Sequence, residues 1–139
     1  MVLRYGLSRL IEIGSDKGKQ LYYAHLSKHE GQQNVNQQQD TQQQNIIWVA
    51  LQSVMDPEVG INIVDMGMVY SVVVSNNQAK VAITMTSPSC PLHVTIRKEA
   101  RQAIMRRLPK LHAVDVRVVW EPPWTPELMT DEAKKTLGW

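Results

Sequence analysis

The sequence has one cysteine, no phenylalanine and no long hydrophobic run, and each shortage excludes a class of protein. A single cysteine, Cys90, cannot form an internal disulfide, so we expect a free thiol in a cytoplasmic protein. One thiol also cannot hold an iron–sulfur cluster alone, because such clusters usually take four cysteines. The apolar runs, such as residues 46–51, are far shorter than the ~20 residues of a membrane helix, and the first residues lack the apolar stretch of a secretory signal.

The sequence also has a low net charge and lacks several catalytic motifs. The chain has 15 Lys and Arg against 13 Asp and Glu, and a formal charge of +2 gives no reason to expect nucleic acid or a membrane as a partner. The sequence has no Cys-x-x-Cys pair, no His/Cys cluster with zinc spacing, no Gly-rich phosphate loop and no nucleophile elbow. The 139 residues, of which 43% are hydrophobic, therefore suit one small domain without a resident metal.

The composition changes sharply near residue 45. Residues 31–45 (GQQNVNQQQDTQQQN) are almost purely polar, so they bury too little apolar surface to offset the entropy of ordering. We predict a disordered linker over this range. Residues 1–30 form an N-terminal extension with either helical or hairpin spacing, which is either a partner-docking element or a poorly ordered segment. Residues 46–139 are expected to form the folded domain.

Periodicity predicts a regular order of elements within this domain. Alternating apolar residues indicate three strands, the Asn76-Asn77 pair favours a hairpin, and Thr130 is a cap for the last helix. The predicted elements are a helix over residues 46–55, strands over 68–75 and 80–86, a helix over 90–108, a strand over 114–119 and a short helix ending at 137. A right-handed crossover makes the third strand parallel to the second. The expected fold class is α/β (α+β), with a small three-stranded mixed sheet packed against two to three helices in the order α-β-β-α-β-α.

Cys90 is the main candidate for chemistry. Ser89 is expected to cap the predicted helix, with Cys90 and Pro91 in its first turn. Unpaired N–H groups and the helix dipole favour negative charge there, so a thiol in that place tends to have a lowered pKa. Cys90 is then either a nucleophile, a metal ligand or a small buried apolar residue. His93, on the same side of the helix, either adds positive character or is an ordinary surface histidine.

Several polar residues allow two interpretations each. Asp56 and Glu58 lie in a rigid turn and either ligate a metal, contact a partner or orient the thiol, or else Asp56 simply ends the helix with an Asx turn. Asp65 allows the same two interpretations, and Thr86 is close enough to the Cys90 loop to hydrogen-bond there. Four cations off the apolar stripe of the predicted 90–108 helix form either a binding surface or a solvated face: Arg97, Lys98, Arg101 and Arg106.

Four motifs occur together in this sequence. They are DPEVGI at 56–61, IVDMGMVY at 63–70, TMTSPSCPL at 84–92 and PPWTP at 122–126. In this order and spacing they resemble the SufT/PaaD family of iron–sulfur cluster assembly domain proteins over residues 46–139. Two methionines replace the leucines of the family pattern, which conserves volume. PaaD-type members typically carry further cysteines, so this chain is more similar to the stand-alone SufT type.

The resemblance implies a non-enzymatic accessory factor in iron–sulfur cluster assembly or in the maturation of iron–sulfur proteins. Cys90 would be a transient cluster ligand or a docking residue, with no intrinsic cofactor. The supporting residues that we predict are Asp56, Glu58, Thr86, Pro91 and His93. The implied partners are the assembly machinery, client apo-proteins and a second copy of the chain in a homodimer. The alternatives are a PaaD-like assembly subunit for a phenylacetyl-CoA oxygenase, and a thiol-dependent enzyme with Cys90 as nucleophile and His93 as base.

Overall fold

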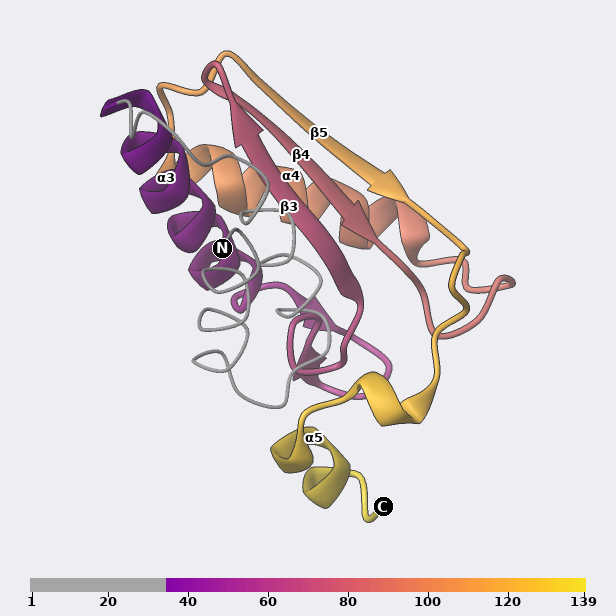
Figure 1. Ribbon diagram of the computed structural model, residues 1–139. Helices are drawn as coiled ribbons and strands as arrows, with labels where there is room; N and C mark the ends of the chain where they lie inside the picture. Colours follow the sequence, from indigo (N-terminus) through magenta and orange to yellow (C-terminus); the bar gives the residue numbers. More distant parts are fainter. Residues whose placement is uncertain (1–34) are drawn as a thin grey trace.

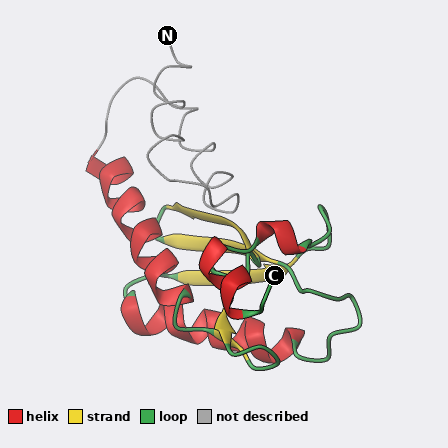
Figure 2. Cartoon of the chain, turned by 90° about the horizontal axis from the view of Figure 1, so that it is seen from below, coloured by secondary structure: helices red, strands yellow, loops and turns green. Residues whose placement is uncertain are grey.

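The fold is a three-stranded sheet with two long helices on one of its faces (Figures 1 and 2). It comes from a computed structural model, which describes residues 35–139. The predictions for the N-terminal extension lie outside the described residues. The elements are α3 (Val35–Leu51), β1 (Met55–Asp56), β2 (Ile61–Asn62), β3 (Val69–Ser75), β4 (Gln78–Ile83), α4 (His93–Arg107), β5 (Ala113–Val118), the 3-10 helix η2 (Pro126–Leu128) and α5 (Asp131–Thr136).

The sheet has the predicted topology. Its strand order is β3-β4-β5, with β3 and β4 antiparallel and β4 and β5 parallel. The turn between β3 and β4 is the predicted one, because Asn76 and Asn77 have φ values of 51° and 61°, as a tight hairpin turn requires. The mixed three-stranded sheet and the order α-β-β-α-β-α are therefore confirmed, and Thr130 caps α5 by accepting a hydrogen bond from the Ala133 N–H at 3.2 Å.

The linker prediction is wrong for residues 35–45, which form the first part of α3. Glutamine is a good helix former, and a polar composition does not by itself prevent a helix that packs on a sheet. Gln43 and Gln44 are buried, and Gln43 Nε2 donates to Asn77 Oδ1 at 3.1 Å, which ties the helix to the hairpin turn. The remaining linker residues, 31–34, lie outside the part that the structure describes.

Two further helix boundaries differ from the predictions. α3 ends at Leu51 rather than before Pro57, because residues 55–56 instead pair with residues 61–62 in a two-stranded ribbon that the sequence did not predict. α4 begins at His93 and not at Cys90, and its N-cap is Leu92 without a side-chain hydrogen bond. Ser89 is therefore not the cap. The reason is local, since a proline disfavours helical backbone in the residue before it, and Pro91 follows Cys90.

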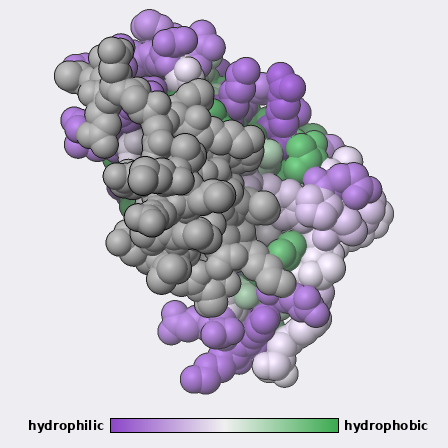
Figure 3. Space-filling model, viewed as in Figure 1, coloured by the Kyte–Doolittle hydropathy of each residue, from purple (hydrophilic) through white to green (hydrophobic). Residues whose placement is uncertain are grey.

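The core lies between the sheet and the two long helices. The largest fully buried side chains come from α3, α4, the strands and the turn before β3: Ile47, Leu51, Ile63, Met66, Met68, Ile83, Ile96 and Ile104. Where described residues are visible in Figure 3, hydrophobic residues form small separate patches among hydrophilic ones. No helix within residues 35–139 is long and apolar enough to cross a membrane.

Candidate functional site

All four sequence motifs lie at one end of the sheet, which we call the motif end. Val69, at the start of β3, pairs with Ile83 at the end of β4, and Ile83 pairs with Val118 at the end of β5. The segments before β3, after β4 and after β5 therefore leave the sheet at the same end, opposite the Asn76-Asn77 turn (Figure 1). In parallel pairs of strands, the carboxyl ends are where ligand sites commonly form. Residues far apart in the sequence thus meet where a functional site is expected.

The C-terminal segment is fastened to the turn that precedes β3. Trp124 Nε1 donates to Met66 O at 2.7 Å, and Thr130 N–H donates to Asp65 O at 2.9 Å. Gly67 has a φ of 69°, and a Cβ added there would overlap the backbone carbonyl of Leu128. These contacts pack residues 124–130 directly against residues 65–67. Sequence analysis did not predict the partner of Trp124, although a buried indole N–H usually needs one.

The predicted acidic turn is built around a buried carboxylate. Asp56 is buried, and its Oδ1 accepts the Glu58 N–H at 2.9 Å. Its backbone carbonyl accepts the Gly60 N–H at 2.8 Å. Asp56 therefore makes the predicted Asx turn, but it does not end the helix, because α3 ends at Leu51. Glu58 is exposed on the surface. The two carboxylates face different environments, so they do not form a pair.

Asp65 also uses its carboxylate within a turn. Asn62 Nδ2 donates to Asp65 Oδ2 at 2.7 Å, and the Asp65 N–H donates back to Asn62 Oδ1 at 2.9 Å. Asn62 was not predicted, although asparagine before a turn commonly makes this kind of bond. Among residues 35–139, no group of three or more His, Cys, Asp or Glu residues is arranged to hold a metal ion.

Cys90 lies in a short loop, residues 87–92, which we call the thiol loop. The Cys90 N–H donates to Ser87 O at 3.1 Å, and Ser87 Oγ and Ser89 Oγ lie 2.9 Å apart. The Cys90 side chain is half-buried and packs against the edge of the core. Pro91 is exposed and follows the thiol directly. The thiol is therefore held between the core and the surface, just before α4 rather than inside its first turn.

His93 contacts the backbone of Cys90 and not its sulfur. His93 Nδ1 lies 3.0 Å from Cys90 O, and because a carbonyl only accepts, Nδ1 carries the proton in this contact. Within the described part of the chain, Cys90 Sγ has no hydrogen-bond partner, and the Thr86 side chain makes no hydrogen bond either. The predicted bond from Thr86 to the thiol loop is thus not present.

A buried tyrosine at the motif end was not predicted as a site residue. Tyr70 donates its hydroxyl hydrogen to Pro122 O at 2.8 Å and lies near the buried Thr84. Burial raises the pKa of Tyr70; the Thr84 hydroxyl acts in the opposite direction, and the negative charge of Glu121 adds to the rise. The phenol therefore stays neutral and serves as a donor that holds the PPWTP segment.

The chain is similar to a described protein family and to two named relatives. A family model described as iron–sulfur cluster assembly protein matches residues 44–118. The chain is 40% identical over 90 residues to the Fe-S protein maturation auxiliary factor YitW of Bacillus subtilis. This match covers 64% of this chain and 87% of that protein. It is 38% identical over 86 residues to the Fe-S protein maturation auxiliary factor SufT of Staphylococcus aureus, covering 61% of this chain and 97% of that protein.

A solved structure supports the same fold. The crystal structure of a domain of unknown function from Bacillus anthracis superposes with a TM-score of 0.71 at 36% sequence identity. The match covers 74% of this chain and 98% of that chain. The two chains therefore share the same overall course of the backbone.

Proposed function

The chain belongs to the iron–sulfur cluster assembly protein family, and from that premise we propose that it is a non-enzymatic accessory factor in the maturation of iron–sulfur proteins. The chain matches 87% and 97% of the length of two relatives named as maturation auxiliary factors, which supports a role of the same kind. The partners that follow from this role are the cluster assembly machinery and client apo-proteins. A homodimer and a cytoplasmic location stay predictions.

The position of Cys90 carries the proposal. Its side chain is half-buried at the motif end, and no hydrogen bond occupies its sulfur within residues 35–139. A thiolate is a soft ligand that suits iron–sulfur clusters, but one thiol supplies only one of the usual four ligands. The remaining ligands would come from a partner protein, a second copy of the chain or a small thiol. Such a site suits a cluster in transit, or a contact with a client, better than stable storage.

The acidic turn has a supporting role in this proposal. Asp56 holds the turn through its bond to the Glu58 N–H, and the turn leaves the Glu58 carboxylate exposed. We infer that Glu58 contacts a partner while Asp56 shapes the surface. Pro91 stiffens the thiol loop on the other side, and Thr86 lies at its base.

The contacts of His93 do not favour a thiol-dependent enzyme. General-base activation needs a base within hydrogen-bond reach of the thiol and a third group that orients the base. His93 Nδ1 is instead bound to the Cys90 carbonyl at 3.0 Å. We therefore infer that His93 helps to fix the backbone of the thiol loop.

The test is complementation of a strain that lacks the gene. We expect Cys90→Ala to lower the activity of iron–sulfur enzymes in extracts, while Ser89→Ala, a matched change in the same loop, keeps them at the wild-type level. Circular dichroism of both purified variants checks that the fold is intact. Full complementation by Cys90→Ala would remove the thiol from the proposal.

A second experiment separates a cluster ligand from a docking residue. The purified chain is incubated anaerobically with iron and sulfide, and the absorbance and mass of wild type and Cys90→Ala are compared. Colour in wild type that is lost in Cys90→Ala supports a transient ligand. A colourless wild type together with failed complementation supports docking.

A further inference from the structure

Within residues 35–139, strand β5 is an edge strand of the three-stranded sheet. It pairs only with β4 among the described strands. The Val119 N–H donates to Ile83 O at 2.7 Å, so the backbone of residue 119 faces β4. Because neighbouring residues of a strand direct their backbone groups to opposite sides, the N–H and C=O groups of Val114, Val116 and Val118 face away from β4. Such a row of backbone groups is a template for another strand.

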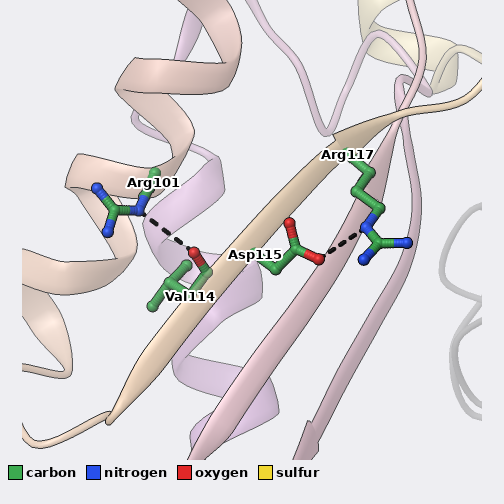
Figure 4. A network of polar contacts seen from close by, with 4 residues as sticks. All are labelled: Arg101, Val114, Asp115 and Arg117. Carbon is green, nitrogen blue, oxygen red and sulfur yellow. Dashed lines mark hydrogen bonds and ion pairs between the residues drawn. The ribbon is translucent and has the colours of Figure 1, made fainter.

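A contact from α4 supports this assignment. Arg101 Nε donates to Val114 O at 3.3 Å, so this carbonyl points away from β4 and towards the α4 side of the edge (Figure 4). Arg101 occupies only the first of the three outward carbonyls. The outward groups of Val116 and Val118 pair with no other strand in residues 35–139.

A shallow groove of about 410 Å³ runs between α4 and β5 beside this edge. Its apolar lining comes from Val94, Val114 and Val116, of which Val94 is 53% exposed and the two β5 valines are largely buried. Its polar lining is dominated by three cations of α4: Arg97, Lys98 and Arg101. An apolar floor, a free strand edge and a cationic wall thus lie side by side.

The charge of this groove is strongly one-sided. Its only acidic residue is Asp115, and Asp115 Oδ2 is already paired with Arg117 Nε at 2.7 Å (Figure 4). The cations of α4 therefore have no acidic partner in the groove, although the whole chain has a formal charge of only +2. Charge complementarity with these cations therefore favours a ligand that carries carboxylates.

We propose that the α4–β5 groove binds an extended acidic segment of a partner protein. The segment pairs its backbone with Val116 and Val118 as a fourth strand, and its carboxylates lie against Arg97, Lys98 and Arg101. This is recognition by strand addition, in which main-chain bonds give affinity and side chains give selectivity. The groove is a surface separate from Cys90, and the proposal does not depend on the thiol.

The groove fits this occupant better than two others. In a second copy paired edge to edge, the same cations of both chains would approach each other. A nucleic acid strand usually stacks its bases on aromatic side chains, and no aromatic residue lines the groove. Both occupants remain outcomes of the test.

The test uses a short fluorescent peptide of alternating glutamate and valine, with binding to the full chain followed by anisotropy. We expect this peptide to bind saturably and in a salt-sensitive way. A control peptide of alternating lysine and valine should not bind. The glutamate–valine peptide with all of its backbone amides methylated should bind about tenfold more weakly, because neither of its two strand edges can then donate N–H groups to β5. Equal binding of the methylated peptide would overturn strand addition.

Two double variants with the same change of charge locate the site. Arg97→Glu with Lys98→Glu should weaken binding by about tenfold or more, because it reverses charge in the groove. Arg106→Glu with Arg107→Glu, on the same helix but outside the groove, should change it by less than about twofold. Equal losses in the two double variants would overturn the site. Two-dimensional NMR spectra check that each variant is folded. In wild type, addition of the glutamate–valine peptide should shift the resonances of Val116 and Val118.

Three further outcomes decide the identity of the occupant. Cys90→Ala should bind the peptide like wild type, which separates this proposal from the one for the thiol. Tighter binding of a single-stranded oligonucleotide than of the acidic peptide would overturn the choice of a protein ligand. A dimer in light scattering that dissociates when the peptide is added would assign the edge to a second copy and overturn the proposal.

Discussion

Two segments meet at the motif end and are held in place very differently. The anchored turn, residues 54–67, is fixed by its own side-chain caps and by bonds to the C-terminal segment. Among residues 35–139, the thiol loop has hydrogen bonds only to residues within a few positions of it, together with the packing of Cys90 and Leu92 on the core. The difference indicates that motifs of equal prominence in the sequence serve unlike purposes. Those of the anchored turn build the fold, and that of the thiol loop leaves the Cys90 thiol only half-buried.

The largest effect is expected where the anchored turn meets the C-terminal segment. Gly67→Ala should lower the free energy of unfolding by about 3–4 kcal/mol, because it adds a clash with the Leu128 carbonyl to a strained positive φ. Urea denaturation measures this. Gly60→Ala is the matched control, because Gly60 has a φ of 71° but nothing within 4 Å of an added Cβ. It should cost about 1–2 kcal/mol. Equal effects would show that residues 124–130 do not hold the turn.

A smaller effect on the free energy of unfolding is expected from substitutions in the acidic turn, residues 56–60. Asp56→Ala removes a buried carboxylate that accepts the Glu58 N–H, so it should destabilise the fold by about 1–2 kcal/mol. Glu58→Ala changes an exposed side chain and should lie within about 0.5 kcal/mol of wild type. Thermal or urea unfolding of both variants gives the comparison. If Glu58→Ala were the more damaging of the two, the division of roles between these carboxylates would be wrong.

The smallest effect on stability is expected in the thiol loop. Cys90→Ala should change the free energy of unfolding by less than about 1 kcal/mol, because the side chain is only half-buried. In wild type, a thiol reagent should label Cys90 without unfolding, so the labelling rate should not follow the stability changes of the Asp56 and Gly67 variants. A labelling rate that tracks global unfolding would instead place the thiol among the anchored groups.

The sheet and its hairpin were predictable because their signals are local. The alternation of Val81 and Ile83 with less buried neighbours marks a strand, and adjacent asparagines at 76 and 77 accept positive φ at little cost. Thr130 caps α5 through an atom three residues away, which is also a local signal. The sequence predicts Cys90 in the first turn of a helix, whereas α4 begins at His93, because Pro91 disfavours helical backbone at Cys90.

The rest depends on contacts between distant residues. The glutamine-rich part of α3 is ordered where Gln43 contacts Asn77, which composition cannot reveal. The β1–β2 ribbon consists of two pairs of residues, too short for any periodicity. The motifs at the candidate site were recognisable one by one. Their meeting at one end of the sheet follows from strand direction, and the bond of Trp124 to Met66 was visible only in the structure.

The fastening of the anchored turn also has a consequence for synthesis of the chain. Trp124 and Met66 are 58 positions apart, and Tyr70 and Pro122 are 52 apart. The β3–β4 hairpin can form as soon as it leaves the ribosome, whereas contacts between distant positions form late and slowly. The acidic turn and the thiol loop therefore emerge well before the C-terminal segment that completes the motif end. A nascent chain would expose Cys90 while this end of the sheet is still unfinished, until residues 122–124 have been synthesised and have packed against Tyr70 and Met66.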